Sequence, residues 1–230
     1  MSERFWVFAY GSLMWRPGFA FDEAQPATLT GYARAFCVYS THHRGTERKP
    51  GLVLGLDRGG VCHGRAYRVP DDQAGAVHDY LRAREQVNGV YRERRVPVDL
   101  DDGSGRRVRA LTYIVERAHP GYAGRLPVQR QADIIRGARG LSGPNIDYLA
   151  NAIEELGEAG AGADQRALQS ILSLIHPFFR RAARNGSAPS PVARALVAAE
   201  QRRAPLVRQP KRLERRRFLY RMNCERLSTG

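Results

Sequence analysis

The spacing of apolar residues changes once along this chain, at about Pro120, and this change limits the fold more than any other feature. Before it, short segments rich in aromatic residues, valine and leucine are bounded by Gly, Pro, Asp and His, which is typical of β-strands. After it, apolar residues recur about every 3.6 residues, which is typical of amphipathic helices. Because strands and helices are segregated along the chain, we expect an α+β fold. The expected strands are residues 5–9, 33–39, 52–57 and 64–69, then a hairpin of 92–100 and 107–115 around a turn at 101–105, and the late helices are 127–140, 143–160 and 164–184.

One helix, expected at residues 71–88, interrupts the strands between a Pro-Asp-Asp start and an Asn-Gly stop. Glu85 lies about 80° from Val77 on its helical wheel, on the shoulder of the apolar stripe and not opposite it. One interpretation is a glutamate that reaches solvent and pairs with Arg82 or Arg92. The other is a partly buried carboxyl about one turn before the helix end, where burial and the helix dipole raise its pKa toward that of a general acid/base.

The segment FAYGSLMW, residues 8–15, breaks an apolar strand at Tyr10, Gly11 and Ser12 and resumes it at Leu13. One interpretation is an ordinary glycine turn whose aromatic residues join the core. The other is that Gly11 lets the backbone approach a ligand, so that successive N–H groups from Gly11 to Leu13 bind an anion. Ser12 lacks the G-x-S-x-G context of a nucleophile, and we expect it only to add a hydroxyl to this loop.

The segment STHHRG invites a metal interpretation, but the adjacent His42 and His43 cannot share a strand face and no third ligand is suitably spaced. We therefore expect no metal site there. Arg44 can hold a carboxylate with both guanidinium nitrogens, or it can be a solvated loop arginine. The later segment GARGLSG, residues 137–143, lacks the G-x-G-x-x-G spacing of a dinucleotide site.

The net charge of +14 is concentrated late in the chain, since residues 185–230 hold 11 basic and 3 acidic residues. We divide the chain into a domain at 1–184 and a linker with an arginine-rich tail at 185–230. Either this basic C-terminal extension packs on the domain as a solvated helix, or it binds nucleic acid or an anionic surface, and we expect the first. The three scattered cysteines, the lack of a membrane-length apolar run and the lack of a signal-peptide pattern predict a cytoplasmic protein.

Taken together, WVFAYGSLMW, STHHRG, GRAYRVP leading into YLRARE, and GPNIDYL resemble the ChaC family of γ-glutamylcyclotransferases that act on glutathione. The resemblance runs from about Phe5 to about Leu174 and implies a small mixed closed β-barrel with flanking α-helices. It implies that Glu85 is the catalytic carboxyl, with no cofactor and no metal. The substrate contacts that it implies are Tyr10, Gly11, Ser12, Leu13, Arg44 and Tyr113, with Tyr91 and Tyr148 as weaker candidates. The segment QVNGVY is one residue longer than in some relatives, which affects the expected role of Tyr91.

The implied reaction needs no external nucleophile, because the γ-glutamyl amine attacks its own γ-carbonyl carbon and expels Cys-Gly as 5-oxoproline forms. Such a ring closure gains much of its rate from proximity. Two alternatives stay open at this point. The same chemistry can act on other γ-glutamyl amino acids or amines, and the basic tail can make the chain a binding module for nucleic acid or an anionic surface.

Overall fold

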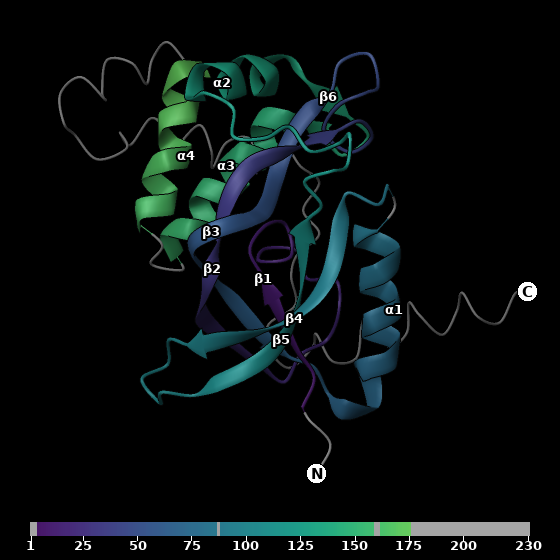
Figure 1. Cartoon of the computed structure of the whole chain (residues 1–230), viewed down its shortest axis with the longest axis vertical. Helices are drawn as coiled ribbons and strands as arrows, with labels where there is room; N and C mark the ends of the chain where they lie inside the picture. Colours follow the sequence, from purple (N-terminus) through teal and green to yellow (C-terminus); the bar gives the residue numbers. More distant parts are fainter. Residues whose placement is uncertain (1–3, 87, 159–161, 176–230) are drawn as a thin grey trace, which may run out of the picture.

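Five strands form a closed barrel in the order β1-β3-β2-β4-β5 (Figure 1). The computed structural model describes residues 4–86, 88–158 and 162–175. β1 pairs antiparallel with β3 and parallel with β5, so the barrel is closed by a mixed sheet, as expected. The strands are β1 (Trp6–Ala9), β2 (Glu23–Ser40), β3 (Gly51–Arg68), β4 (Tyr91–Leu100) and β5 (Arg107–Val115).

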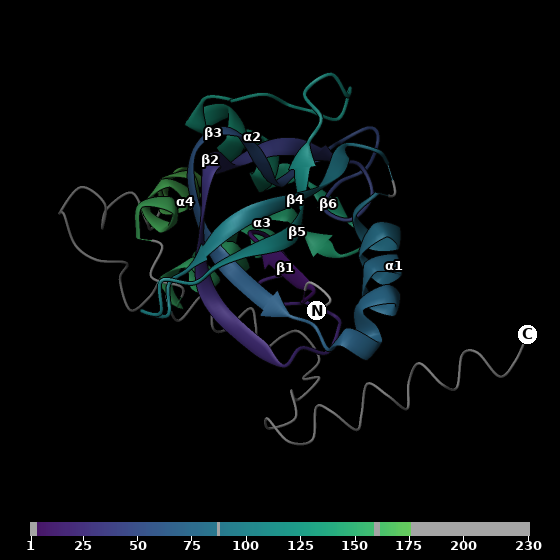
Figure 2. The same cartoon turned by 60° about the horizontal axis from the view of Figure 1, so that its bottom comes forward.

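The helices lie on two sides of the barrel (Figures 1 and 2). A 3-10 turn, η1 (Asp71–Gln73), leads into α1 (Ala74–Glu85), which stands apart from the three later helices. Those are α2 (Val128–Gly137), α3 (Asn145–Glu158) and α4 (Gly162–Ile175), with the short ribbon β6 (Arg139–Gly140) and β7 (Gly143–Pro144) between α2 and α3. None of the helices in the described residues is long and apolar enough to span a membrane. The end of the predicted helix 164–184 and the whole tail 185–230 lie outside the described residues.

Two strands are much longer than the sequence pattern indicates, and the predicted boundaries are wrong there. The predicted strand 33–39 is the second half of β2, and the predicted strands 52–57 and 64–69 are parts of the single strand β3. Gly59 and Gly60 have φ values of 93° and 90°, which only glycine adopts easily, so β3 bends at this point without leaving the sheet. A shift of register in β2 between Thr30 and Tyr32 faces this bend. Glycines that look like turn residues in the sequence therefore lie at bulges inside long, curved strands.

The α-helix predicted at 71–88 begins later and ends earlier than expected. Only residues 74–85 are α-helical, and Gln86 caps the last turn with an N–H bond of 3.0 Å to the carbonyl oxygen of Arg82. Gly89, at φ 71°, then turns the chain into β4. Glu85 is consequently the last residue of α1, not a residue one turn before its end, while Val77 packs in the core as the helical wheel predicts.

Both faces of β1 are buried because residues alternate between two layers of the core. Trp6 and Phe8 belong to a cluster drawn from all five barrel strands and from none of the helices, which is the barrel interior. Val7 and Ala9 belong to a second cluster that includes residues of α1, α2, α3 and α4. The alternation fixes the end of β1 from both sides and so positions the loop that follows it.

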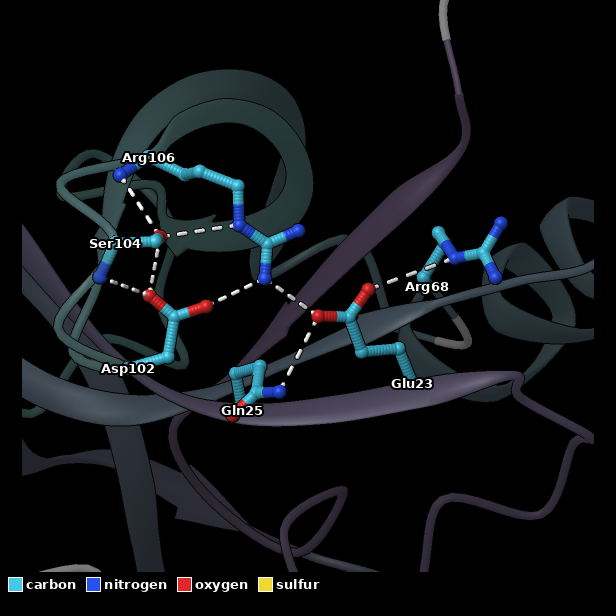
Figure 3. Close-up of polar contacts among 6 residues, drawn as sticks. All are labelled: Glu23, Gln25, Arg68, Asp102, Ser104 and Arg106. Carbon is cyan, nitrogen blue, oxygen red and sulfur yellow. Dashed lines mark hydrogen bonds and ion pairs between the residues drawn. The ribbon is translucent and has the colours of Figure 1, made fainter.

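The turn between β4 and β5 is tied to the start of β2 by a network of polar side chains (Figure 3). Arg106 pairs with Asp102 within the turn and reaches Glu23 of β2 at 2.6 Å. Glu23 in turn lies 3.6 Å from Arg68 at the end of β3. The predicted hairpin is therefore confirmed, and its turn is held by contacts with β2, whose Glu23 also lies near Arg68 of β3.

Candidate active site

Glu85 is a partly buried carboxyl at the end of α1. Its side chain is 17% exposed, and its nearest cation is Arg84, with Nε 3.2 Å from Oε1. Burial raises the pKa of Glu85, and the neighbouring Arg84 guanidinium opposes part of that rise. The carboxyl pairs with neither Arg82 nor Arg92 in the described ion pairs, and Arg92 instead contacts Glu116. The functional interpretation of Glu85 as a carboxyl of raised pKa fits this environment.

The loop after β1 is a tight turn whose first backbone amides lack a protein acceptor in the described residues. The N–H of Met14 donates to the carbonyl of Gly11 at 2.9 Å, and the N–H of Arg16 donates to the carbonyl of Ser12 at 2.9 Å. Within the described residues, no acceptor is recorded for the N–H groups of Gly11, Ser12 and Leu13. The two interpretations of this segment are thus compatible, because the hydrogen bonds that form the turn leave its first amides without partners in the described residues.

Ser12 and Gly11 connect this loop with residues far along the chain. The hydroxyl of Ser12 accepts a hydrogen bond of 2.9 Å from Arg84, the residue that also pairs with Glu85. A Cβ atom at Gly11 would lie 3.2 Å from the hydroxyl of Tyr148, which is tighter than most Cβ contacts. The glycine therefore allows the loop to approach Tyr148 of α3, while Ser12 connects the loop to the end of α1.

Four tyrosine side chains lie close enough to Glu85 to interact with its charge. Tyr91 donates to the carbonyl of Leu54 at 2.9 Å, while the hydroxyl of Tyr148 accepts from the N–H of Leu54 at 3.4 Å. Tyr10 donates to the carbonyl of Tyr113 at 2.8 Å. Burial raises the pKa of all four phenols, and the nearby negative charge of Glu85 raises it further. These hydroxyls stay neutral, so they can position a substrate but do not supply a charged base.

The hydroxyl of Tyr113 is engaged by a carboxylate other than Glu85. It donates to Oε2 of Glu93 at 3.3 Å, and Glu93 also bonds His78 of α1 at 2.9 Å. Tyr113 is close enough to Glu85 to interact with its charge. Its hydroxyl, however, is held by a separate chain of polar contacts through Glu93 of β4 and His78 of α1.

Arg44 lies in the loop after β2 and faces Tyr148. Its Nη1 donates to the carbonyl of Pro144 at 3.0 Å, and its guanidinium lies 5.7 Å from the centre of the Tyr148 ring. Burial lowers its pKa, and the nearby Asp147 opposes that change. Among the described residues no carboxylate lies within ion-pair distance of Arg44, so its charge is available to an anionic ligand.

Sequence reasoning missed two arginines that shape this site. Arg84 is adjacent to Glu85 and bonds Ser12, and Arg34 of β2 donates to the carbonyl of Tyr10 at 2.6 Å. Neither gives a signal in the sequence, since an arginine beside a glutamate or within a strand does not reveal its distant partners. Within the described ranges no group of three or more His, Cys, Asp or Glu side chains is arranged to hold a metal ion.

This arrangement can bind an anionic substrate and move a proton. Free amides and an unpaired arginine suit a carboxylate or an oxyanion. A carboxyl whose pKa is raised by burial can accept and return a proton near neutral pH.

Comparison with known proteins places these features in a family. The family model described as "ChaC-like protein" matches residues 5–177. The chain is 40% identical over 159 residues to the glutathione-specific gamma-glutamylcyclotransferase of Escherichia coli, covering 69% of this chain and 68% of the relative. It is 35% identical over 172 residues to glutathione-specific gamma-glutamylcyclotransferase 1 of Homo sapiens, covering 74% of this chain and 78% of the relative.

A solved structure agrees with the sequence relatives. The crystal structure of the yeast gamma-glutamyl cyclotransferase specific to glutathione superposes with a TM-score of 0.67 at 26% identity, covering 77% of this chain and 100% of the yeast chain. The barrel, the loop after β1 and the carboxyl at the end of α1 thus lie within a region shared with these proteins, and the chain belongs to the ChaC family.

Proposed function

We propose that this protein degrades glutathione by cyclising its γ-glutamyl group, which releases 5-oxoproline and Cys-Gly. The observation that carries the proposal is Glu85, a partly buried carboxyl of raised pKa that Arg84 links to the hydroxyl of Ser12 in the loop after β1. The names of the E. coli and human relatives support glutathione as the substrate. The protein is then an enzyme of the γ-glutamylcyclotransferase class.

The reaction forms one C–N bond and breaks another within the same molecule. The α-amine of the glutamyl unit, once deprotonated, attacks the γ-carbonyl carbon and closes a five-membered ring. The Glu85 carboxylate accepts the proton that the amine loses and returns it to the cysteinyl nitrogen as that nitrogen leaves. Because the attack is intramolecular, holding the chain folded back supplies several kcal/mol of the acceleration, on the order of 7 kcal/mol for well-oriented groups.

The loop amides and Arg44 have the task of holding the glutamyl unit. We propose that the N–H groups of Gly11, Ser12 and Leu13, together with Arg44, bind its α-carboxylate. The hydroxyls of Tyr10 and Tyr113, with those of Tyr91 and Tyr148 as further contacts, line the space around it. Such prepositioned donors lose little free energy to reorganisation when charge develops.

The position of Glu85 at the end of α1 favours proton transfer. The negative end of a helix dipole disfavours a carboxylate, so it adds to the effect of burial on the pKa. A single carboxyl with a pKa nearer to neutrality can act first as base and then as acid.

The substrate assignment is tested by comparing two γ-glutamyl amides. The purified chain is incubated with glutathione and, separately, with γ-glutamyl-alanine, and 5-oxoproline is quantified in each. We expect 5-oxoproline from glutathione and little from γ-glutamyl-alanine. Turnover of γ-glutamyl-alanine alone would support the alternative, the same chemistry on other γ-glutamyl amino acids or amines.

We further propose a cytoplasmic location and a catalytic domain spanning residues 1–184. The cysteines Cys37 and Cys62 are both buried free thiols, which suits a reducing compartment. The family match at residues 5–177 falls within the proposed domain and leaves the arginine-rich tail outside it.

A further inference from the structure

Arg34 of β2 is a charged side chain with almost no contact with solvent. Its side chain is 1% exposed, whereas the other arginines in the described ion pairs range from 21% exposed at Arg84 to 68% at Arg107. Its Nε donates to the carbonyl oxygen of Tyr10 at 2.6 Å, and one Nη group pairs with the carboxylate of Asp164. The other Nη group contacts the carbonyl of His63 and lies 3.7 Å from Sδ of Met14.

Burying a guanidinium costs several kcal/mol of folding free energy unless its N–H donors are paired with acceptors, because the charge loses its hydration in a low-dielectric interior. Packing alone would be served as well by an apolar side chain of similar volume. The partners of Arg34 are one carboxylate and two backbone carbonyls, one of which is the carbonyl of Tyr10. The charge is therefore directed at the first peptide of the loop after β1.

The bond to Tyr10 determines where the next amide points. The peptide between Tyr10 and Gly11 is trans, as are all peptides in the described residues. In a trans peptide the C=O and N–H groups point in opposite directions. Fixing the Tyr10 oxygen against Arg34 therefore fixes the Gly11 N–H on the other side of the peptide plane. A guanidinium on the carbonyl also polarises the peptide and makes its N–H a stronger donor.

Asp164 fixes Arg34 in turn. It lies in the first turn of α4, and its side chain is 24% exposed. The carboxylate balances the arginine charge and keeps the guanidinium aimed at the barrel. Through this pair, α4 is connected to the loop after β1, although the two are more than 100 residues apart in sequence.

We propose that Arg34 is a positioning residue that orients the Gly11 N–H toward the glutamyl carboxylate, and that Asp164 holds Arg34 in place. This inference rests on the proposed function, since it assigns the Gly11 N–H to the substrate of that reaction. Arg34 itself does not contact the substrate. It acts through the peptide that joins Tyr10 to Gly11.

The test uses three variants of the full chain and one matched control. Arg34→Lys keeps the charge but not the forked geometry, Arg34→Gln removes the charge, and Asp164→Asn removes the counter-charge. Arg65→Gln is the control, because Arg65 also ties the barrel to a helix, through a 2.9 Å pair with Glu155, and has no recorded contact with the loop. Circular dichroism establishes which variants fold. If Arg34→Gln does not fold, the proposal is tested with Asp164→Asn and Arg34→Lys.

Kinetics and an activity-independent signal are measured on the same samples. The KM for glutathione should rise roughly 10- to 100-fold in Arg34→Gln, and less in Arg34→Lys and Asp164→Asn, with kcat changed much less. The amide resonance of Gly11 in a ¹H–¹⁵N spectrum should shift in these variants and not in Arg65→Gln.

The results distinguish the positioning role of Arg34 from a general loss of structure and from failure of the proposed function. If the Gly11 resonance stays in place in the folded variants, or shifts while KM does not change, the positioning role is wrong. An equal rise of KM in Arg65→Gln would show a general effect of loosening the helices and would also overturn it. If the wild-type chain makes no 5-oxoproline, the proposed function fails, whereas the resonance shift still decides whether Arg34 orients the Gly11 amide.

Discussion

Glu85 carries a titratable group at a position where the fold disfavours a charge. It is the last residue of α1, and burial raises its pKa despite the opposing effect of Arg84. A carboxyl in such a place reduces the stability of the folded chain at neutral pH, which is a common property of catalytic groups.

Replacing Glu85 by Gln should stabilise the protein at pH 8. Because the folded-state pKa is raised, the folded chain holds the proton more tightly than the unfolded chain does. The wild type therefore loses stability as the pH rises from the unfolded pKa, about 4.3, through the folded-state pKa. Glu85→Gln does not titrate and should show a higher Tm at pH 8, with the difference shrinking toward pH 4. A lower Tm for the variant at pH 8 would contradict the raised pKa.

Gly11 is a glycine because of its neighbour and not because of its φ angle. A Cβ atom there would lie 3.2 Å from the hydroxyl of Tyr148, so the tyrosine must move by a few tenths of an ångström. We expect Gly11→Ala to fold and to lose roughly 10- to 100-fold in kcat/KM, because the loop and Tyr148 no longer meet correctly.

The matched control for Gly11→Ala is Gly75→Ala in α1. A Cβ atom at Gly75 meets nothing within 4 Å, so this variant should keep its activity and gain roughly 0.5–1 kcal/mol of stability from helix propensity. Kinetics and thermal melts of both variants check the pair. Full activity in Gly11→Ala would show that the close approach has no catalytic role.

Sequence alone predicts residues whose signal is local and misses those whose partners are distant. The helical wheel marks Glu85, and the interrupted strand marks Gly11. By contrast, Arg34 lies 130 residues from Asp164 in the chain, and nothing near it indicates that it is buried. Arg84 is similar, because its bond to Ser12 spans 72 residues.

At the scale of elements, the late helices and the β4–β5 hairpin could be predicted, but the length of β2 and β3 could not. Helix periodicity and a short polar turn are local patterns. A strand that bends around a barrel contains glycines at positive φ, as at Gly59 and Gly60, and these look the same as turn residues in sequence. Only the closed sheet reveals that the chain continues in the same strand.

Asp57 connects β3 with residues 117–125, the segment that follows β5. Its side chain is 1% exposed. It accepts hydrogen bonds from Arg117 at 2.6 Å, from Tyr122 at 3.0 Å and from Arg125 at 3.4 Å. Burial acts to raise the pKa of Asp57, but the bonds from Arg117 and Tyr122 outweigh it and lower the pKa.

Asp57→Ala should therefore lower the free energy of unfolding by about 1–3 kcal/mol, since several donors lose a shared buried acceptor. Urea unfolding measures this loss. The control is Asp99→Ala, which removes an exposed pair with Arg107 and should leave stability unchanged. Equal effects in the two variants would show that burial of Asp57 does not matter.

At the scale of the whole molecule, the proposed site lies within the part of the chain shared with the family. The candidate residues fall between Tyr10 and Tyr148, and the family match covers residues 5–177. The basic tail 185–230 lies outside both the match and the described residues.

A chain truncated after residue 184 should therefore keep the kcat/KM of the full chain for glutathione, measured by 5-oxoproline release. A large loss would show that the tail takes part in catalysis. The same pair of chains tests the binding alternative. Salt-dependent affinity for nucleic acid that disappears with the tail would support it, and the absence of binding at low salt would dismiss it.

The proposed role of Glu85 is to carry the proton in an intramolecular cyclisation of glutathione. It is tested by quantifying 5-oxoproline and Cys-Gly from glutathione with the wild-type chain and with Glu85→Gln, each verified as folded. We expect equal amounts of both products from the wild type and a rate lower by roughly 10²- to 10⁴-fold in the variant, because the amide keeps the shape but cannot transfer the proton. A wild-type rate in Glu85→Gln, or no 5-oxoproline from the wild type, would contradict it.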